Sequence, residues 1–281
     1  MEPSLPLLQH TLARLDPKRV RRALGRAAPV MPEDLLAAIH VSLLERCAEI
    51  RFTPEQLLEV GRVPGPCAQA LQSRHPKARV LSLGIAPPGA SWTPRLRLPW
   101  KHHPLAVTGD PLRFPLPANH FDLALSNMML HWSSDPLATL RELRRVLKPE
   151  APLLLATLGE SSLKELKQTL ATLDQTRHGR VWHRVPAFPA LPDLGDLLVA
   201  AGFSRPVVDR DLWQPRLPDG HTLLHEMRRI GATNPHRQRP PCLMGKGYLA
   251  EVNTLYSVNH GTEDGSIPVT LEILFGHAWK K

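Results

Sequence analysis

The stretch Leu57-Leu58-Glu59-Val60-Gly61 and the later stretch Val80-Leu81-Ser82-Leu83-Gly84-Ile85 decide the fold of this chain. Each is a short, mostly apolar run that reaches a glycine at or near its end, which is typical of a buried strand. Residues 67–74 between them have the pattern of a crossover helix. Strand, turn, helix and strand in this order form half of a Rossmann-type unit. The sequence therefore predicts an α/β protein with a nucleoside site.

The turn after the first strand reads Gly61-Arg62-Val63-Pro64-Gly65. In nucleoside-binding units this turn is rich in glycine because the backbone approaches the ligand, and an acidic residue about 20 positions later bonds the ribose. We therefore take Glu59, Gly61 and Gly65 as candidate cofactor contacts, together with Gly84, which stands where that acid is expected. A tight strand-to-helix turn explains the two turn glycines equally well.

The apolar pattern predicts further elements on either side of this unit. Strands are expected at residues 105–109, 121–127, 152–158, 206–212 and 269–279, and helices at residues 35–50, 136–147 and 194–201. The Pro-rich segment 87–104 is expected to be an irregular crossover. Residues 1–50 would form a helical cap, residues 51–160 the nucleoside-binding core, and residues 161–281 the substrate-side helices, a lid and the closing strands of the same sheet.

Three polar residues follow predicted strands on the side where open α/β sheets bind ligands. Ser126 and Asn127 end the fourth strand, and Asp110 comes directly after the third. We expect all three near the cofactor. Since Asp110 precedes Pro111, the start of a turn is an equally good explanation of that residue.

Composition limits the location and the partners of the protein. The 281 residues contain no apolar run long enough to cross a bilayer and no secretory stretch at the amino end, so we expect a cytoplasmic location. Cys47, Cys67 and Cys242 lie far apart, which favours reduced thiols and predicts neither a disulfide framework nor a metal site. The net charge of +9 indicates an acidic partner. The basic residues lack interleaved aromatics, which disfavours nucleic acid.

Four stretches together resemble a known family. They are Gly25 to Ala28, Asp110 through Phe121–Asn127 to His131-Trp132, Met227 to Asn234 with its Ile-Gly-Ala-Thr-Asn run, and the terminal Phe275-Gly276-His277-Ala278-Trp279. The chain resembles the class I S-adenosylmethionine-dependent methyltransferases, and within them the BioC type, the malonyl-acyl-carrier-protein O-methyltransferases of biotin synthesis. The resemblance implies a Rossmann-like fold with a mostly parallel seven-stranded sheet, an antiparallel C-terminal strand and a helical lid. We interpret His277 and Trp279 as structural residues at a sheet edge.

The resemblance also implies a reaction, which is methyl transfer from S-adenosylmethionine to the free carboxylate of malonyl-acyl carrier protein. Because a carboxylate is already a nucleophile, alignment and desolvation carry the catalysis, and no catalytic side chain is identified. Arg228 and Arg229 could neutralise the malonyl carboxylate or contact the carrier protein, or another acidic protein. A solvated helix face is the plainer explanation of this pair. His131-Trp132 is interpreted as a packed helix start.

The sequence departs from the family pattern at cofactor positions. Val63 replaces a turn glycine, Gly84 replaces the ribose-binding acid, and Met31 stands where the family has a tyrosine. Two hypotheses therefore remain open. The chain is either an active methyltransferase of the BioC type with a diverged pocket, or a catalytically degenerate methyltransferase-fold protein that acts as a binding or regulatory module. A nucleic-acid-modifying methyltransferase is a third hypothesis, based on charge alone.

Overall fold

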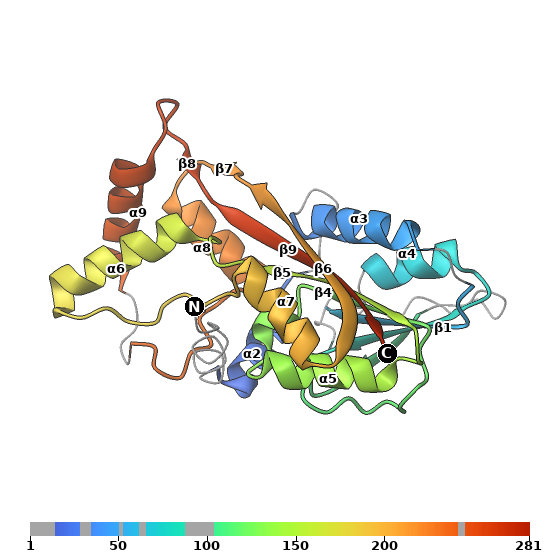
Figure 1. The fold of residues 1–281 in the computed structure, drawn as a ribbon. Coiled ribbons are helices and arrows are strands. Elements are labelled where there is room, and N and C mark those ends of the chain that lie inside the picture. Colours follow the sequence, from blue (N-terminus) through green and yellow to red (C-terminus); the bar gives the residue numbers. More distant parts are fainter. Residues whose placement is uncertain (1–14, 29–34, 51–52, 62–65, 88–103, 241–244) are drawn as a thin grey trace.

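The computed structural model describes residues 15–28, 35–50, 53–61, 66–87, 104–240 and 245–281. At the centre is a seven-stranded sheet with the order β3-β2-β1-β4-β5-β9-β6 (Figure 1). The strands are β1 (Gln56–Gly61), β2 (Arg79–Gly84), β3 (Leu105–Thr108), β4 (Leu123–Asn127), β5 (Pro152–Leu158), β6 (Phe203–Trp213) and β9 (Leu271–Lys280). The first five strands pair in parallel, and β9 is antiparallel to both of its neighbours, β5 and β6.

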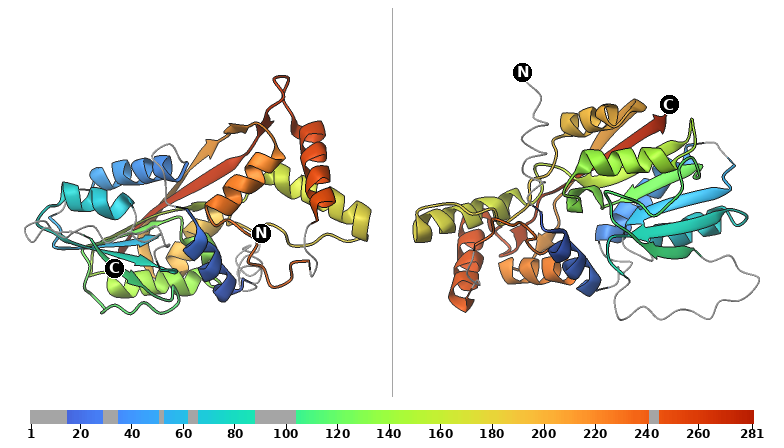
Figure 2. Two further views of the ribbon diagram at one scale, coloured as in Figure 1. Left: turned by 180° about the vertical axis from the view of Figure 1, so that it is seen from behind. Right: turned by 90° about the horizontal axis from the view of Figure 1, so that it is seen from below.

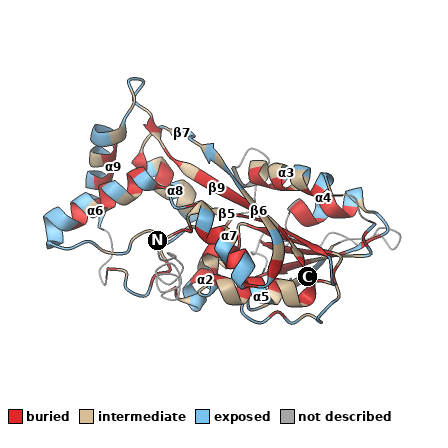
Figure 3. Cartoon of the chain, in the orientation of Figure 1, coloured by how far each residue is buried: buried red, intermediate tan, exposed pale blue. Residues whose placement is uncertain are grey.

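Helices cover both faces of the sheet, and the alternation of side chains along β1 shows why. Leu57 packs in one core with α3 (Leu35–Ala48) and α4 (Pro66–Arg74), whereas the next residue, Leu58, packs in the other core with α5 (Pro136–Val146) and α7 (Leu191–Ala200). Successive strand residues point to opposite faces, so a strand buried on both sides must be continuously apolar. Figure 3 shows the buried residues concentrated between the two helical layers.

A second group of elements lies beyond one end of the sheet and has its own core (Figure 1). We call this group the lid. It comprises α6 (Lys164–His178), α8 (Gly220–Arg229), α9 (Lys246–His260) and the short pair β7 (Arg216–Leu217) and β8 (Ile267–Pro268). Leu170 of α6, Leu223 of α8 and Val252 of α9 are buried together.

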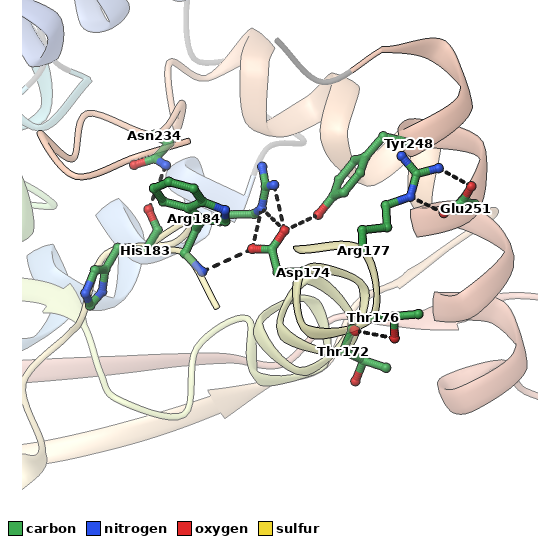
Figure 4. Close-up of polar contacts among 10 residues, drawn as sticks. Thr172, Asp174, Thr176, Arg177, His183, Arg184, Asn234, Tyr248 and Glu251 are labelled. Atoms are coloured by element: carbon green, nitrogen blue, oxygen red, sulfur yellow. Dashed lines mark hydrogen bonds and ion pairs between the residues drawn. The ribbon is translucent and has the colours of Figure 1, made fainter. Parts of the chain in front are cut away.

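A buried ion pair ties the lid helices together (Figure 4). The single Nε–H of Arg184 donates a hydrogen bond shared between both carboxylate oxygens of Asp174 in α6, and Nη2 donates a second, at 2.7–3.0 Å; the Asp174 side chain is fully buried. The hydroxyl of Tyr248 in α9 donates to the same carboxylate at 3.1 Å, and the Trp182 amide donates at 3.2 Å. The one carboxylate therefore joins α6, α9 and the loop between α6 and α7.

The predicted fold class is confirmed, with all seven expected strands in place. The helices expected at 35–50, 136–147 and 194–201 correspond to α3, α5 and α7, while α6, α8 and α9 were not predicted. Most of the crossover expected at 87–104 lies outside the described residues. The placement of His277 and Trp279 at a sheet edge is wrong, because β6 pairs along the outer side of β9 and makes β9 an interior strand.

The amino-terminal elements pack directly on the rest of the chain. Ile39 and Leu43 of α3 belong to the same core as β1, β4 and β5. The helix α2 (Pro17–Arg26) buries Val20 in the core on the other face of the sheet. None of the described helices has the length and apolar character needed to span a membrane.

Candidate functional site

The strand order of the sheet changes direction between β1 and β4, and the candidate site lies where these two strands end. Open α/β sheets bind ligands outside the carboxyl ends of the strands at such a switch point. Gly61 ends β1 at this edge. A Cβ atom built on Gly61 would lie 2.8 Å from Oε1 of Glu59 and 3.1 Å from the carbonyl oxygen of Asn127. The close backbone contact with Asn127 therefore favours glycine at this position.

Glu59 is a buried acid in β1, two residues before the strand ends at this edge, with 1% of its surface exposed. The hydroxyl of Ser82, its neighbour in the β1–β2 register, donates a hydrogen bond to its Oε2 atom. No basic side chain in the described segments forms an ion pair with Glu59. Burial raises the pKa of this carboxyl to about 7, against a smaller opposing effect of the Ser82 hydrogen bond. Glu59 is therefore part protonated near neutral pH.

Asn127 ends β4 with an unsatisfied acceptor. Its Nδ2 donates to the sulfur of Cys67 at 3.4 Å, while its buried Oδ1 receives no hydrogen bond from the residues that the structure describes. Buried polar atoms are nearly always paired, so an orphaned acceptor at a strand end indicates a ligand donor or a water molecule. Burial and the nearby charge of Glu59 raise the pKa of the Cys67 thiol, which keeps it protonated. Ser126 is buried beside Asn127.

The neighbouring strand ends continue the same edge. Gly84 pairs with Gly61 in the register of β1 and β2, and its carbonyl oxygen accepts a hydrogen bond from the Gly109 amide at 2.9 Å. Asp110 follows at an exposed position, and its Oδ1 accepts from the Leu112 amide at 2.9 Å. Asp110 thus caps its own turn, as the plainer interpretation predicted, while still lying at the edge where a cofactor contact was expected.

This edge has the chemistry that a nucleoside needs. Glu59 and Asn127 offer buried acceptors, and Gly61 and Gly84, which pair in register, end adjacent strands without a side chain of their own. The turn residue Gly65, predicted with them, lies outside the described residues. No group of three or more potential metal ligands occurs in the described part of the chain.

Two motifs far apart in the sequence meet beside this edge. The Ala28 amide, from the Arg-Ala-Ala stretch, donates to the carbonyl oxygen of Arg229 at 2.8 Å. Gly231 of the Ile-Gly-Ala-Thr-Asn run has a φ of +81°, and a Cβ there would lie 3.0 Å from the carbonyl oxygen of Ala23. This close packing against α2 requires glycine at position 231. α2 thereby joins the lid to the sheet end, and a Cβ on Gly25 would lie 3.8 Å from that of Ala86.

Arg228 and Arg229 end α8 at this junction. Arg228 is exposed, while Arg229 is half-buried and its Nε donates to Glu226 Oε2 at 2.7 Å. The two predicted substrate contacts therefore lie on the lid next to the motif junction. Arg228 presents its charge to solvent, and the charge of Arg229 is shared with Glu226.

Several residues of the site were not identified from the sequence. Ser82 is one, although Glu59 and Ser82 each stand two positions before the glycine that ends an apolar strand, a signal that could have paired them. Lys167 of α6 is another, and no sequence signal marks it. Its ammonium group lies 4.8 Å from the centre of the Phe188 ring, and that ring lies 6.0 Å from the ring of His131.

His131 connects this second group to the carboxyl ends of β4 and β5. It is buried in the short 3₁₀ helix η1 (Leu130–Trp132), and its Nδ1 lies 3.2 Å from the hydroxyl of Thr157 in β5. Burial lowers the pKa of His131 to about 3, so the ring is neutral in the folded protein. Burial also lowers the pKa of Lys167, to about 8. A cation and two rings therefore lie next to the cofactor edge.

The seven-stranded sheet with its inserted antiparallel β9, and the polar cluster at the β1–β4 switch, define a Rossmann-like methyltransferase fold. Solved structures with this fold include the YcgJ protein of Bacillus subtilis, with 15% identity, a TM-score of 0.52, and 86% of this chain and 98% of that chain covered. A second is phosphoethanolamine N-methyltransferase 2 of Haemonchus contortus, with 13% identity, a TM-score of 0.52, and 93% and 60% covered.

Proteins with similar sequences identify the family within this fold. The "Methyltransferase domain" family matches residues 58–155. The malonyl-[acyl-carrier protein] O-methyltransferase of Gallionella capsiferriformans is 35% identical over 274 residues, which cover 95% of this chain and 91% of that protein. The protein of the same name from a Methylovorus species is 34% identical, with 95% and 90% covered. The chain belongs to the class I S-adenosylmethionine-dependent methyltransferases, in the family of these BioC-type enzymes.

Proposed function

We propose that this protein transfers a methyl group from S-adenosylmethionine to the free carboxylate of malonyl-acyl carrier protein, as a cytoplasmic step in biotin synthesis. Similarity to malonyl-[acyl-carrier protein] O-methyltransferases along nearly the whole chain supports this substrate. The single structural observation that supports the proposal is the buried Oδ1 of Asn127, which has no hydrogen-bond partner among the described residues and belongs to the strand end next to Gly61 at the switch point, where open α/β sheets bind ligands.

In this proposal the residues of the β1–β4 edge hold the cofactor. Glu59, Asn127 and Ser126 supply polar contacts, Gly61, Gly65 and Gly84 supply backbone, and Asp110 flanks them. Bound S-adenosylmethionine would supply a methyl group activated by sulfonium charge. The chain needs no general base, since a carboxylate is nucleophilic at neutral pH. Its contribution is to align the carboxylate and to exclude water.

Two sets of cations are candidates to bind the malonyl carboxylate. Arg228 and Arg229 lie at the motif junction, and Lys167 lies beside the carboxyl ends of β4 and β5, over Phe188. Loss of a charge-assisted contact to substrate typically costs about 1.5–3 kcal/mol. Two variants separate the two sets: Lys167→Met, and Arg228→Gln combined with Arg229→Gln. Only substitution of the set that contacts the carboxylate should raise the KM for malonyl thioesters. If Lys167 is that contact, KM should also rise with pH through about 8, because the amine then loses its proton.

Titration calorimetry with S-adenosylmethionine and with its demethylated product tests the proposal directly. We expect saturable heat for both ligands, and transfer of a labelled methyl group to malonyl-acyl carrier protein. Glu59→Gln and Asn127→Leu should weaken the cofactor, whereas Asp264→Asn, an exposed change in the β7–β8 region, is the control. Absence of heat at millimolar ligand would refute the enzyme hypothesis.

The degenerate binding module remains a second candidate, favoured by one observation. Gly84 places no side chain at the end of β2, where a ribose-binding acid is expected. The test compares the wild type with the double variant Gly84→Asp, Val63→Gly. If only the double variant binds the cofactor, the wild-type protein has lost catalysis and retains only its binding surface for an acidic partner. Tight binding by the wild type removes this candidate.

A further inference from the structure

The helix α2 is the most basic element that the structure describes. Five of its ten residues are Lys or Arg and none is acidic. Its charged side chains lie on the exposed face, at Lys18, Arg19, Arg21, Arg22 and Arg26. Among the described residues Asp16, which caps the helix, is the acid that pairs with α2, and it lies 3.5 Å from Arg19. Like charges gathered on one helix repel each other, so this arrangement lowers stability unless an acidic partner offsets it.

The other face of α2 is fully used inside the protein. Val20 is 1% exposed, and Leu24 packs on the same core. Ala23 and Ala27 form the surface against which Gly231 packs. The backbone before the helix is bound as well, since the Asp16 amide donates to the Pro235 carbonyl at 2.9 Å. α2 is thus a fixed part of the protein that can present its charges without rearrangement.

The position of α2 links its charge to the site. Figure 2 shows α2 lying between α8 and the sheet. Its carboxyl end adjoins Ala86, just past the end of β2, and Ala28 is bonded to Arg229. The exposed Arg228 lies at this junction, and the exposed Arg237 follows His236, which pairs with Leu15 just before the amino end of α2, so both extend the basic surface. We call the exposed cations of α2 with Arg228 and Arg237 the basic rim.

We propose that the basic rim is the docking surface for an acidic carrier protein, which binds on the exposed face of α2 and delivers its thioester-linked acyl group over the carboxyl edge of the sheet. The inference rests on the proposed function and adds to it the location of the partner. Charge complementarity selects the partner, because a dense, preformed cationic face steers and orients an acidic protein.

Two other anionic partners fit this face less well. An amphipathic helix binds a membrane by burying its apolar face in the lipid, and here that face is occupied by the protein core. Single-stranded nucleic acid favours aromatic side chains between cations, and α2 contains no aromatic residue. An acidic protein needs neither feature.

The test compares two matched charge reversals in the full-length protein. Arg21→Glu with Arg22→Glu alters the rim. Arg74→Glu with Lys77→Glu reverses two exposed cations at the end of α4 and in the turn before β2, at the opposite edge of the sheet. We expect the rim variant to raise the KM for malonyl-acyl carrier protein by about tenfold or more and the control pair to leave it unchanged. Methylation of malonyl-coenzyme A, which has no protein portion, should be the same in all three proteins.

The outcomes are distinct. An unchanged KM for malonyl-acyl carrier protein in the rim variant overturns the inference, and so does an equal loss with both thioesters, because α2 would then act on the site itself. Loss of binding to RNA or anionic vesicles without a change in that KM assigns the rim to another partner. If the wild type methylates neither thioester, the proposed function fails. Fluorescence anisotropy of labelled malonyl-acyl carrier protein then tests docking alone, and equal affinity of wild type and rim variant, or no binding by either, refutes it.

Discussion

Glu59 and His131 are buried ionisable residues near the same sheet edge, and burial favours the neutral form of each, with opposite effects on the pKa. Burial raises the pKa of Glu59 to about 7 and lowers that of His131 to about 3. Neither has an ion-pair partner among the described residues. His131 is therefore neutral and Glu59 part protonated near neutral pH, so a charged ligand at this edge would meet a carboxyl group that can gain or lose its proton.

Glu59 should make stability fall as the pH rises. A raised folded-state pKa means that its contribution is complete below the ordinary value, near 4.5, and is lost as the pH rises through about 7. Glu59→Gln removes this dependence. The free energy of unfolding of the variant minus that of the wild type is therefore expected to rise between pH 4.5 and 7, by on the order of a few kcal/mol. Denaturant unfolding across this range measures it, and a pH-independent difference would contradict the assignment.

His131 should have the opposite effect. Its lowered folded-state pKa means that its contribution is present above about 6.5, the ordinary value, and is lost as the pH falls towards 3. His131→Gln keeps a neutral polar group near Thr157 and should lose less stability on acidification than the wild type. His221, exposed at the start of α8, provides the control substitution. The same slope in wild type and His131→Gln would show that the ring is not held neutral.

At the scale of elements, the buried Asp174 carboxylate stabilises the packing of α6 against α9 and the loop before α7. Burial alone would raise the pKa of Asp174, but hydrogen bonds from Arg184 and the Trp182 amide hold it below its usual range. Removing one member of a buried pair leaves the other charge uncompensated, so Asp174→Ala should cost about 3–5 kcal/mol.

The exposed pair Arg177 and Glu251, which joins α6 to α9 at the surface, is the control for the lid, and Glu251→Ala should cost far less stability than Asp174→Ala. Chemical denaturation followed by the fluorescence of Trp182 distinguishes the two sites. Equal losses in the two variants would show that the buried pair does not hold the lid.

The strands of the sheet were predictable from the sequence, whereas the individual helices of the expected lid were not. Apolar runs ending in Gly61 and Gly84 mark strands buried on both faces, because their residues must serve two cores. α6 begins after Leu163, which has a φ of +58° and makes no side-chain cap, and α9 follows Gly245, which has no side chain to cap the helix. The usual start signals are absent from these helices, so their site residue Lys167 could not be placed.

Only the site residues at strand ends could be predicted from the sequence. Ser126, Asn127 and Glu59 could be located because the carboxyl ends of parallel strands lie at one edge. The contact between Ala28 and Arg229 could not, since it depends on how the lid packs on α2. The interior position of β9 in the sheet was also not predicted, because no pattern in Phe275 to Trp279 indicates that β6 pairs along its other side.

At the scale of the whole molecule, the excess of positive charge should appear as a salt effect on one substrate. The net charge is +9, and α2 places part of it beside the site. Surface charges are screened over roughly 8 Å at physiological ionic strength. The KM for malonyl-acyl carrier protein should therefore rise steeply between low and physiological salt, while the KM for malonyl-coenzyme A changes less. Steady-state kinetics at several sodium chloride concentrations measures both, and parallel slopes would argue against long-range attraction.

The interior position of β9 has a consequence for biosynthesis. Among the described strands β6 pairs with β9 alone, and one edge of β5 keeps its backbone N–H and C=O groups unpaired until β9 joins it. Because β9 follows β5 and β6 in the sequence, the ribosome synthesises it after both of its neighbours. Until then the nascent polypeptide contains β5 and β6 without the strand that pairs with each of them. Such an open edge invites association between copies. Folding of this protein in the cell should therefore finish only after translation has passed β9, and chaperones that shield sticky edges should matter most in that interval.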